Sequence, residues 1–149
     1  MKKYQIILLS LFLIGCSASG PLYTEHVPSV KDVSVVYIYR PIRTVNCCVA
    51  PAIYIDGVKK VSLKNGGYSV FELAPGKHEI KVGDGSYGFD PATVEGTYVA
   101  GTSYYFKWVI GSIQELNLPA MYADRDYHLI KVQNDEAKSE ISSLRYTDS

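Results

Sequence analysis

The chain has 149 residues, with 15 basic and 15 acidic side chains, 47% hydrophobic residues and three cysteines. This length is sufficient for one domain with a substantial core. The balanced charge excludes nucleic acid as the main partner, because phosphate binding requires an excess of Lys and Arg. The hydrophobic content excludes a disordered chain, and three cysteines are too few for a miniprotein held together by disulfides.

The N-terminus has the pattern of a bacterial lipoprotein signal. Lys2 and Lys3 precede an apolar stretch over residues 6–14. That stretch is too short for a permanent transmembrane helix, which needs about 20 apolar residues, but it is typical of a secretory signal. The tetrapeptide Leu-Ile-Gly-Cys that ends at Cys16 is similar to a lipobox, whose cysteine is diacylated. We therefore expect residues 1–15 to be a cleaved signal peptide and Cys16 to carry the lipid.

Residues 16–32 are expected to be the lipidated cysteine followed by a flexible tether. Ser, Gly and Pro interrupt this segment, and no apolar period develops in it. Tyr23 and Val27 are the side chains in it that are candidates for packing on the domain. Several acyl chains on one residue anchor a protein firmly, since each buried methylene contributes about 0.8 kcal/mol. Ser17 follows Cys16, which resembles outer-membrane lipoproteins of Gram-negative bacteria. The membrane partner is thus reached through the lipid, and the expected location is the outer membrane, facing the periplasm or the cell surface.

Residues 33–149 are predicted to form one all-β domain, an antiparallel β-sandwich of about seven or eight strands. Asp56-Gly57 between two β-prone runs predicts a type I′ hairpin, and Pro75-Gly76 marks a further turn. The regular spacing of short strands is typical of a sandwich or barrel, and the lack of alternating helices excludes a doubly wound sheet. The expected strands are 33–40, 52–55, 58–63, 68–73, 77–82, 93–99, 104–110 and 127–132.

One short helix is expected in the C-terminal tail. Asn134 or Asp135 is a suitable N-cap, and Arg145 falls near the predicted end. The residues Ala137, Ile141 and Leu144 form one apolar stripe. This stripe predicts docking on the sheet, with a partner-binding helix as the alternative.

The order of several turn motifs resembles a bacterial lipoprotein family catalogued as the domain of unknown function DUF 2846. The likeness runs from Val33 to Val132, and the turns are also similar to PEGA-type hairpins. It implies a small all-β envelope domain and supplies no activity and no catalytic residues. The segments that carry it are Ile53–Gly57, Val61–Tyr68, Leu73–His78 and Ala100–Phe106, together with Arg40 at the end of the first strand.

The glycine-rich run Gly83–Gly88 matches the spacing of a dinucleotide-binding motif. A dinucleotide site also requires a helix that starts directly after the motif. Here β-branched residues follow, so the sequence predicts a hairpin loop and no cofactor. Asp84, Ser86 and Asp90 alternate in the same loop, but they do not complete a calcium-binding pattern.

The remaining residue patterns give no positive evidence for catalysis or metal binding. No G-x-S-x-G motif is present, and no Ser, Cys or Thr has an evident base beside it. The three histidines, His26, His78 and His128, lack the spacing of metal ligands. His78 follows the Pro-Gly turn, so a packing or capping role is expected for it, and His128 falls in a predicted strand. We therefore expect the protein not to be an enzyme.

Cys47 and Cys48 would be the only free thiols once Cys16 is lipidated. Adjacent Cα atoms lie about 3.8 Å apart, below the usual range for a disulfide, so a bond between neighbours is strained. Three outcomes stay open: a strained vicinal disulfide, reduced and partly buried thiols, or a bond to another chain.

The thirteen tyrosines suggest two readings. Aromatic faces stack on sugars and peptides, so a glycan-binding module is one hypothesis, and it predicts an exposed row of tyrosines on one sheet face. Tyrosine is also favoured on half-buried strands, which predicts a role in the core instead.

These patterns together predict a lipid-anchored, non-catalytic accessory domain of the cell envelope, with an envelope protein or glycan as partner. The expected contacts are the Arg43–Cys48 loop, the loop that carries Asp84 and Tyr87, and the C-terminal helix. The alternatives are a module that binds peptidoglycan or another glycan, a small hydrolase, and an enzyme inhibitor with a protruding rigid loop.

Overall fold

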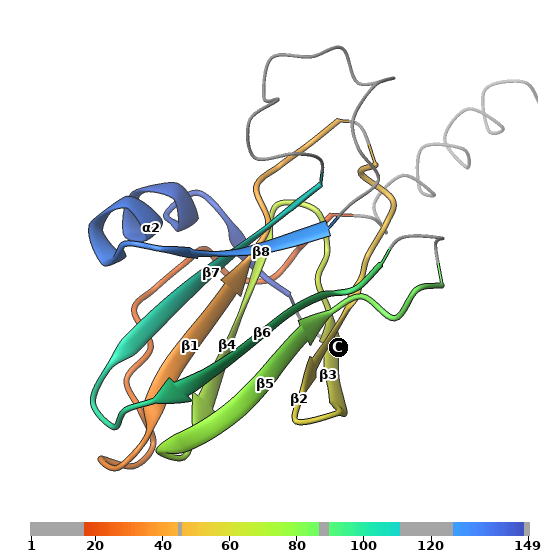
Figure 1. Cartoon of the computed structure of the whole chain (residues 1–149). Coiled ribbons are helices and arrows are strands. Elements are labelled where there is room, and N and C mark those ends of the chain that lie inside the picture. Colours follow the sequence, from red (N-terminus) through yellow and green to blue (C-terminus); the bar gives the residue numbers. More distant parts are fainter. Residues whose placement is uncertain (1–16, 45, 87–89, 111–126, 148–149) are drawn as a thin grey trace, which may run out of the picture.

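Two β-sheets pack face to face in the computed structural model, which describes residues 17–44, 46–86, 90–110 and 127–147 (Figure 1). One sheet has the strand order β8-β7-β1-β4-β9, and the other has the order β3-β2-β5-β6. The all-β sandwich with one short C-terminal helix is therefore confirmed. The elements are β1 (Ser34–Tyr39), β2 (Ala52–Ile55), β3 (Val58–Ser62), β4 (Gly67–Leu73), β5 (Gly76–Val82), β6 (Ala92–Tyr98), β7 (Ser103–Ile110), β8 (Tyr127–Val132), α2 (Asn134–Ile141) and β9 (Arg145–Tyr146).

The larger sheet is mixed, and this differs from the purely antiparallel pairing that the sequence predicted. Strand β1 runs antiparallel to β4 but parallel to β7, and β4 runs parallel to β9. Parallel neighbours require a long connection, and here the chain passes through the whole second sheet between β1 and β7. Local turn signals do not reveal such a connection.

The hairpin between β2 and β3 has the turn that its sequence predicted. Asp56 has a φ of 51° and Gly57 has a φ of 76°, so both residues lie in the left-handed region that a type I′ turn requires. The ends of β2 and β3 agree with the predicted strands 52–55 and 58–63 to within one residue.

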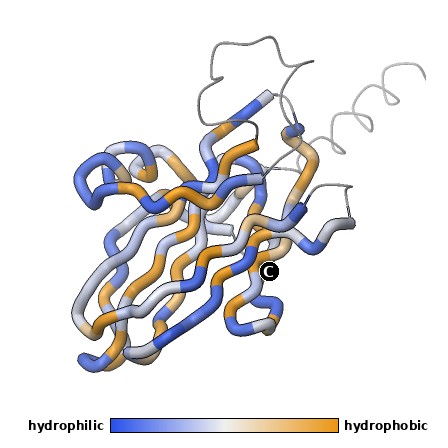
Figure 2. Tube along the Cα trace, in the orientation of Figure 1, coloured by the Kyte–Doolittle hydropathy of each residue, from blue (hydrophilic) through white to orange (hydrophobic). Residues whose placement is uncertain are grey.

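The larger sheet is covered on both faces, so β1 is buried along its whole length. Its inner face contributes Val36 and Ile38 to the core between the sheets, beside Trp108 of β7. Its outer face contributes Tyr37 and Tyr39 to a second cluster. Figure 2 shows apolar positions along the strands of both sheets. This double burial explains why the β1 sequence is apolar at nearly every position.

Helix α2 packs its apolar stripe on the outer face of the larger sheet, as expected, but its ends differ from the prediction. Gln133 occupies the N-cap position and makes no side-chain capping bond. The helix ends at Ile141, while Leu144 is buried beyond it and Arg145 belongs to β9. No helix in the described part of the chain is long and apolar enough to cross a membrane.

The segment from residue 17 to residue 32, expected to be a free tether, lies against the domain. Ala18 is 8% exposed, and its N–H donates to the Asn65 carbonyl at 3.0 Å. The Gly20 and Tyr23 N–H groups donate to carbonyls of the C-terminal segment at 3.2 and 3.1 Å. The contact is close: a Cβ at Gly67 would lie 3.0 Å from the Cβ of Ala18.

The side chain of Tyr23 explains why this segment docks. Its ring packs edge-on against Tyr37 and Tyr68, with ring centroids 5.8 and 5.5 Å apart. An aromatic ring buries a large apolar area, and edge-to-face pairs contribute about 0.5–1.5 kcal/mol beyond that burial. One tyrosine in a segment rich in Ser, Gly and Pro leaves no periodic pattern, so the sequence predicted a tether with Tyr23 or Val27 as its candidate contacts. The structure packs Tyr23 on the domain and leaves Val27 82% exposed.

Candidate functional site

Two of the predicted contact loops lie at the same end of the sandwich. We call this the clamped end: it is where β1 finishes and β4 begins, and it carries the loop 41–51. Arg43 in that loop places its Nη1 3.5 Å from the Ile110 carbonyl at the end of β7. The loop that carries Asp84 starts at the same end, since the Gly83 N–H donates to the Ala52 carbonyl at 2.8 Å.

The other predicted site residues are placed as follows. Asp84 accepts hydrogen bonds from the backbone N–H and the hydroxyl of Ser86, which makes a local turn. The element that follows this loop is β6, so the glycine-rich run has no strand-to-helix context in the described residues. Tyr87 and Cys16 lie outside the described residues.

Arg40 is the residue that fixes the shape of the loop 41–51. Its side chain is 1% exposed, and its guanidinium lies over the ring of Trp108 at 4.9 Å from the centroid. Nη2 donates to the Asn46 carbonyl at 2.6 Å, and Nη1 donates to the Val49 carbonyl. The Val49 N–H also donates to the Asn46 carbonyl at 3.2 Å, which closes a turn with Cys47 and Cys48 at its corner.

The positive charge of Arg40 is buried without a carboxylate to neutralise it among the described residues. Burial lowers the pKa of Arg40 to about 10, so the guanidinium stays charged at neutral pH. Its Nε has no hydrogen-bond partner in the described part of the chain. A buried charge is costly unless its polar atoms are satisfied, and here two carbonyls of a single loop satisfy the Nη atoms. The buried guanidinium therefore serves to hold that loop in one conformation.

Asn65 holds the other side of the same loop. Its Oδ1 accepts from the Arg43 N–H at 3.0 Å, and its Nδ2 donates to the Arg43 carbonyl at 2.9 Å. Asn65 is itself only 6% exposed. The loop held in this way exposes the side chain of Ile42, which is 71% exposed, and the side chain of Cys48. The clamped end is thus a preorganised surface.

Cys47 and Cys48 are free thiols in the structure, with their sulfur atoms 3.3 Å apart. In a strand neighbouring side chains point to opposite faces, but the turn held by Arg40 brings these two together. A hydrogen bond to Cys48 raises the pKa of the Cys47 thiol, because it stabilises the protonated form. Cys48 is the more exposed of the pair.

We expect Cys48→Ala to lower the pKa of Cys47, because the substitution removes the hydrogen bond that raises it. The measurement is the rate of alkylation of the reduced protein between pH 7 and 10, with the Cys47→Ala variant as the reference for Cys48. An alkylation profile of Cys47 that is the same with and without Cys48 would show that the thiols do not interact.

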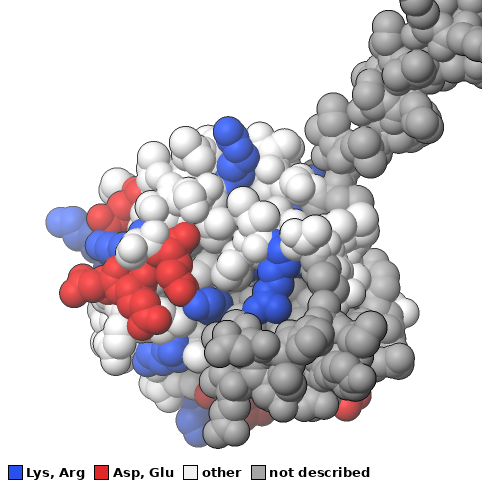
Figure 3. Space-filling model, turned by 90° about the horizontal axis from the view of Figure 1, so that it is seen from above, with Lys and Arg blue, Asp and Glu red and all other residues white. Residues whose placement is uncertain are grey.

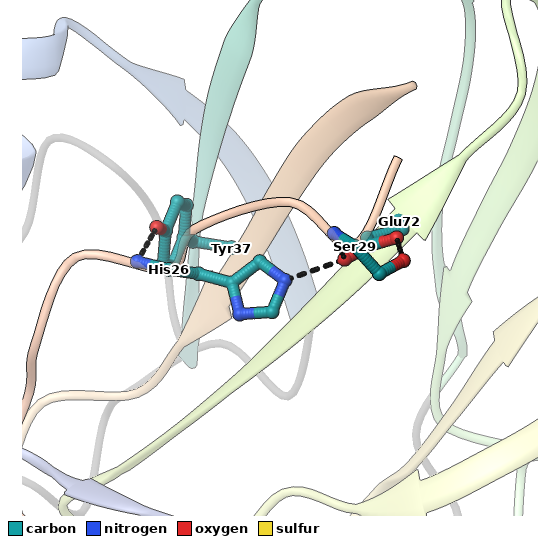
Figure 4. Close-up of polar contacts among 4 residues, drawn as sticks. All are labelled: His26, Ser29, Tyr37 and Glu72. Atoms are coloured by element: carbon teal, nitrogen blue, oxygen red, sulfur yellow. Dashed lines mark hydrogen bonds and ion pairs between the residues drawn. The ribbon is translucent and has the colours of Figure 1, made fainter. Parts of the chain in front are cut away.

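The opposite end of the sandwich, the distal end, carries a polar cluster of His26, Ser29, Tyr37 and Glu72 (Figure 4). His26 Nε2 lies 2.7 Å from Glu72 Oε1, and the Ser29 N–H donates to the same oxygen at 2.8 Å. The Ser29 hydroxyl donates to Glu72 Oε2, and the His26 N–H donates to the hydroxyl of Tyr37 at 2.8 Å. A cavity of about 390 Å³ adjoins this cluster.

This distal cluster does not have the geometry of a serine hydrolase. In a catalytic triad the imidazole lies between the nucleophile and the carboxylate, whereas here Glu72 lies between Ser29 and His26. The hydrogen bonds from Ser29 and His26 hold the pKa of Glu72 at about 2, which makes the carboxylate a poor general base. The cluster instead attaches the N-terminal segment to β4.

This attachment should depend on pH. The pKa of Glu72 is about 2 in the folded protein, below its ordinary value of 4.5. Its stabilising effect is therefore complete above about pH 4.5 and is lost as the pH falls toward 2. We expect the protection of the amides near Ser29, measured against the intrinsic exchange rate at each pH, to fall over that interval in the wild type. In the Glu72→Gln variant this acid transition should vanish. If the variant shows the same transition as the wild type, another titratable group causes it.

The two remaining histidines occupy structural positions. His78 Nδ1 lies 2.7 Å from Asp56 Oδ2, and its Nε2 lies 2.9 Å from the Ala74 carbonyl. The hydrogen bond with Asp56 raises the pKa of His78, so the pair ties the β2–β3 turn to β5. His128 lies in β8. The described residues contain no group of three or more His, Cys, Asp or Glu side chains able to hold a metal ion.

Most tyrosines in the described part of the chain belong to the two core clusters or pack against them. None of the tyrosines in the described part of the chain is exposed. Tyr37 and Tyr105 stack with centroids 4.6 Å apart and ring planes inclined by 3°. This counts against the glycan-binding hypothesis, which requires an exposed row of aromatic rings.

Arg43 and the cysteine pair were singled out from the sequence, whereas Arg40 was noted only as the residue that ends the first strand, and the distal cluster was not predicted. The available signal for Arg40 was its place directly after a run of residues that is apolar on both faces. The signal for the distal cluster was weaker, because His26 and Ser29 lie 46 and 43 residues from Glu72 in the chain.

Comparison with known proteins identifies a family for the larger part of the chain. No curated protein matches the chain. A family model described as "Protein of unknown function (DUF2846)" matches residues 30–117, which is more than half of the chain and includes β1 to β7. The chain belongs to the DUF2846 family.

Proposed function

We propose that the protein is a lipid-anchored, non-catalytic accessory domain of the bacterial cell envelope that holds a protein partner through its clamped end. The observation that carries this proposal is the buried Arg40, whose guanidinium is committed to the two carbonyls that shape the loop 41–51. A preorganised loop loses less conformational entropy on binding than a mobile one, so a loop fixed by the buried Arg40 is well suited to recognition.

The lipid anchor in this proposal is supported by the sequence alone. The basic start, the short apolar stretch and the lipobox at Cys16 are typical of a lipoprotein. The residue after Cys16 is serine, which favours the outer membrane, with the domain facing the periplasm. The lipid would provide the membrane contact, so the domain needs no amphipathic membrane helix.

An inhibitor of another enzyme is the second candidate, because it requires the same structural feature. Inhibitory loops are rigid and protruding, and the loop 41–51 is fixed by Arg40 and Asn65 while it exposes Ile42. The two candidates differ in their target: an accessory domain binds a resident envelope protein, and an inhibitor binds the active site of an enzyme.

The test is site-specific photo-crosslinking in cells. A photoreactive residue replaces Thr44 in the clamped loop or, as the matched control, the exposed Thr97 of β6. We expect one envelope protein to be captured from position 44 and not from position 97, and capture to be lost in Arg40→Lys, since one ammonium cannot replace a guanidinium that binds two carbonyls.

Equal capture from positions 44 and 97, or no capture by a well-expressed lipidated chain, would contradict the proposal. Repeating the capture with Cys16→Ala tests the lipid separately. If the Cys16→Ala protein captures the same partner, the loop recognises that partner without the lipid. If the partner is an enzyme and the loop occupies its active site, the protein is an inhibitor.

A further inference from the structure

We propose that the clamped end of the sandwich faces the lipid bilayer, with the side chain of Ile42 in the headgroup region. This inference rests on the lipid anchor of the proposed function, and it adds the orientation of the domain and the kind of partner that the loop can reach. The evidence for this orientation is the docking of the N-terminal segment at the clamped end.

The docking begins one residue after the lipidated position. Ser17 forms a β-bridge with Asn65, and the Ala18 N–H donates to the Asn65 carbonyl at 3.0 Å. A peptide bond holds neighbouring Cα atoms about 3.8 Å apart, so Cys16 cannot be far from Ser17. A free segment of this length would have reached about 55 Å. The lipid is therefore attached almost directly to the clamped end.

The surface around this attachment point suits a lipid headgroup layer. Ile42 is 71% exposed and lies beside Gly66, where an added Cβ would be 2.6 Å from Ile42 Cγ1. Arg145 is exposed, and its Nη1 donates to the Gly20 carbonyl at 3.1 Å. An apolar side chain is stabilised at the acyl boundary, and a cation near an anionic surface contributes about 1 kcal/mol.

Figure 3 shows Lys and Arg side chains at several separate places on the face that it draws, whereas the largest group of Asp and Glu side chains lies at one side.

The distal end is more apolar, yet the attachment keeps it away from the lipid. Val27 is 82% exposed there, and Val30 and Val99 are exposed by 57% and 56%. The six residues of β1 separate the two ends by about 20 Å. With Cys16 fixed at the clamped end, these valines face the aqueous space. Because the clamped loop faces the bilayer, a protein partner of this loop must be embedded in the membrane or lie at its surface.

The experiment measures how close each end lies to lipid in the full lipidated chain. The protein is reconstituted into vesicles of phosphatidylethanolamine and phosphatidylglycerol that contain a lipid quencher with its spin label near the headgroup. In a Cys47→Ser, Cys48→Ser background, a fluorophore is attached through Ile42→Cys or, as the matched distal control, through Val99→Cys. We expect quenching at position 42 to exceed that at position 99 by about fivefold or more.

A spacer variant separates attachment from intrinsic affinity. About twelve Ser and Gly residues, starting with Ser, are inserted after Cys16 and add a reach of about 40 Å. We expect the quenching at position 42 to fall toward that at position 99. Equal quenching of both positions in protein without the spacer that floats with the vesicles would overturn the orientation and leave the lipid anchor intact. Undiminished quenching at position 42 with the spacer would overturn the claim that the docked N-terminal segment sets this orientation. Failure of the wild type to float would overturn the anchor and the orientation together.

Discussion

Replacing Arg40 by alanine is expected to lower the free energy of unfolding by about 3 kcal/mol, because the change leaves a cavity beside Trp108 and removes the hydrogen bonds to the carbonyls of Asn46 and Val49. Urea unfolding measures this loss. The matched control is Arg145→Ala, which removes an exposed guanidinium with one hydrogen bond to Gly20 and should cost less than about 1 kcal/mol.

Arg40→Met separates packing from clamping, since methionine fills much of the volume but donates no hydrogen bond. We expect this variant to recover part of the stability while amide exchange at Val49 accelerates. If the Val49 amide stays as protected in Arg40→Met as in the wild type, the guanidinium only fills space and the loop does not depend on it.

Tyr37→Ala is expected to lower the free energy of unfolding by about 3–5 kcal/mol. Tyr37 is 1% exposed, stacks on Tyr105 and contacts the ring of Tyr23, so its loss opens the outer cluster and releases the N-terminal segment. Burial also raises the pKa of Tyr37 to about 12, in keeping with a hydroxyl inside the cluster. Thermal or urea unfolding measures the effect.

Two further variants locate the source of this loss. Tyr37→Phe removes only the acceptor for the His26 N–H and should cost about 1 kcal/mol. Tyr54→Ala changes a half-buried tyrosine beside Lys81 on the other sheet, and it should leave the N-terminal segment docked. An equal loss of stability in Tyr54→Ala and Tyr37→Ala would mean that the outer cluster has no special role.

The strands were predictable because their signals are local. The turn at Asp56-Gly57 and the alternation of Lys77 to Val82 are visible in a few neighbouring residues, and the structure has both where expected. The parallel pairing of β1 with β7 and the addition of β9 depend on residues far apart in the chain, so no short pattern encodes them.

The site was predictable only where it could be recognised by residue type. Arg43 and the cysteine pair attracted attention because of their loop and their unusual chemistry. Arg40 was recognised only as the residue that ends a strand, because its role depends on carbonyls of Asn46 and Val49 and on the ring of Trp108. In the segment 17–32 a contact of Tyr23 was among the expectations, but the backbone docking was not predicted, because main-chain hydrogen bonds produce no periodic pattern in the sequence.

Docking of the N-terminal segment is tested most directly by amide hydrogen exchange in the lipidated protein. We expect the amides of Ala18, Gly20 and Tyr23, which donate to backbone carbonyls of the domain, to exchange at least about 100-fold more slowly than in an unstructured peptide. Exchange of all three at the rate of a free peptide would show that the segment is a tether, and the fixed orientation of the clamped end toward the membrane would then be contradicted.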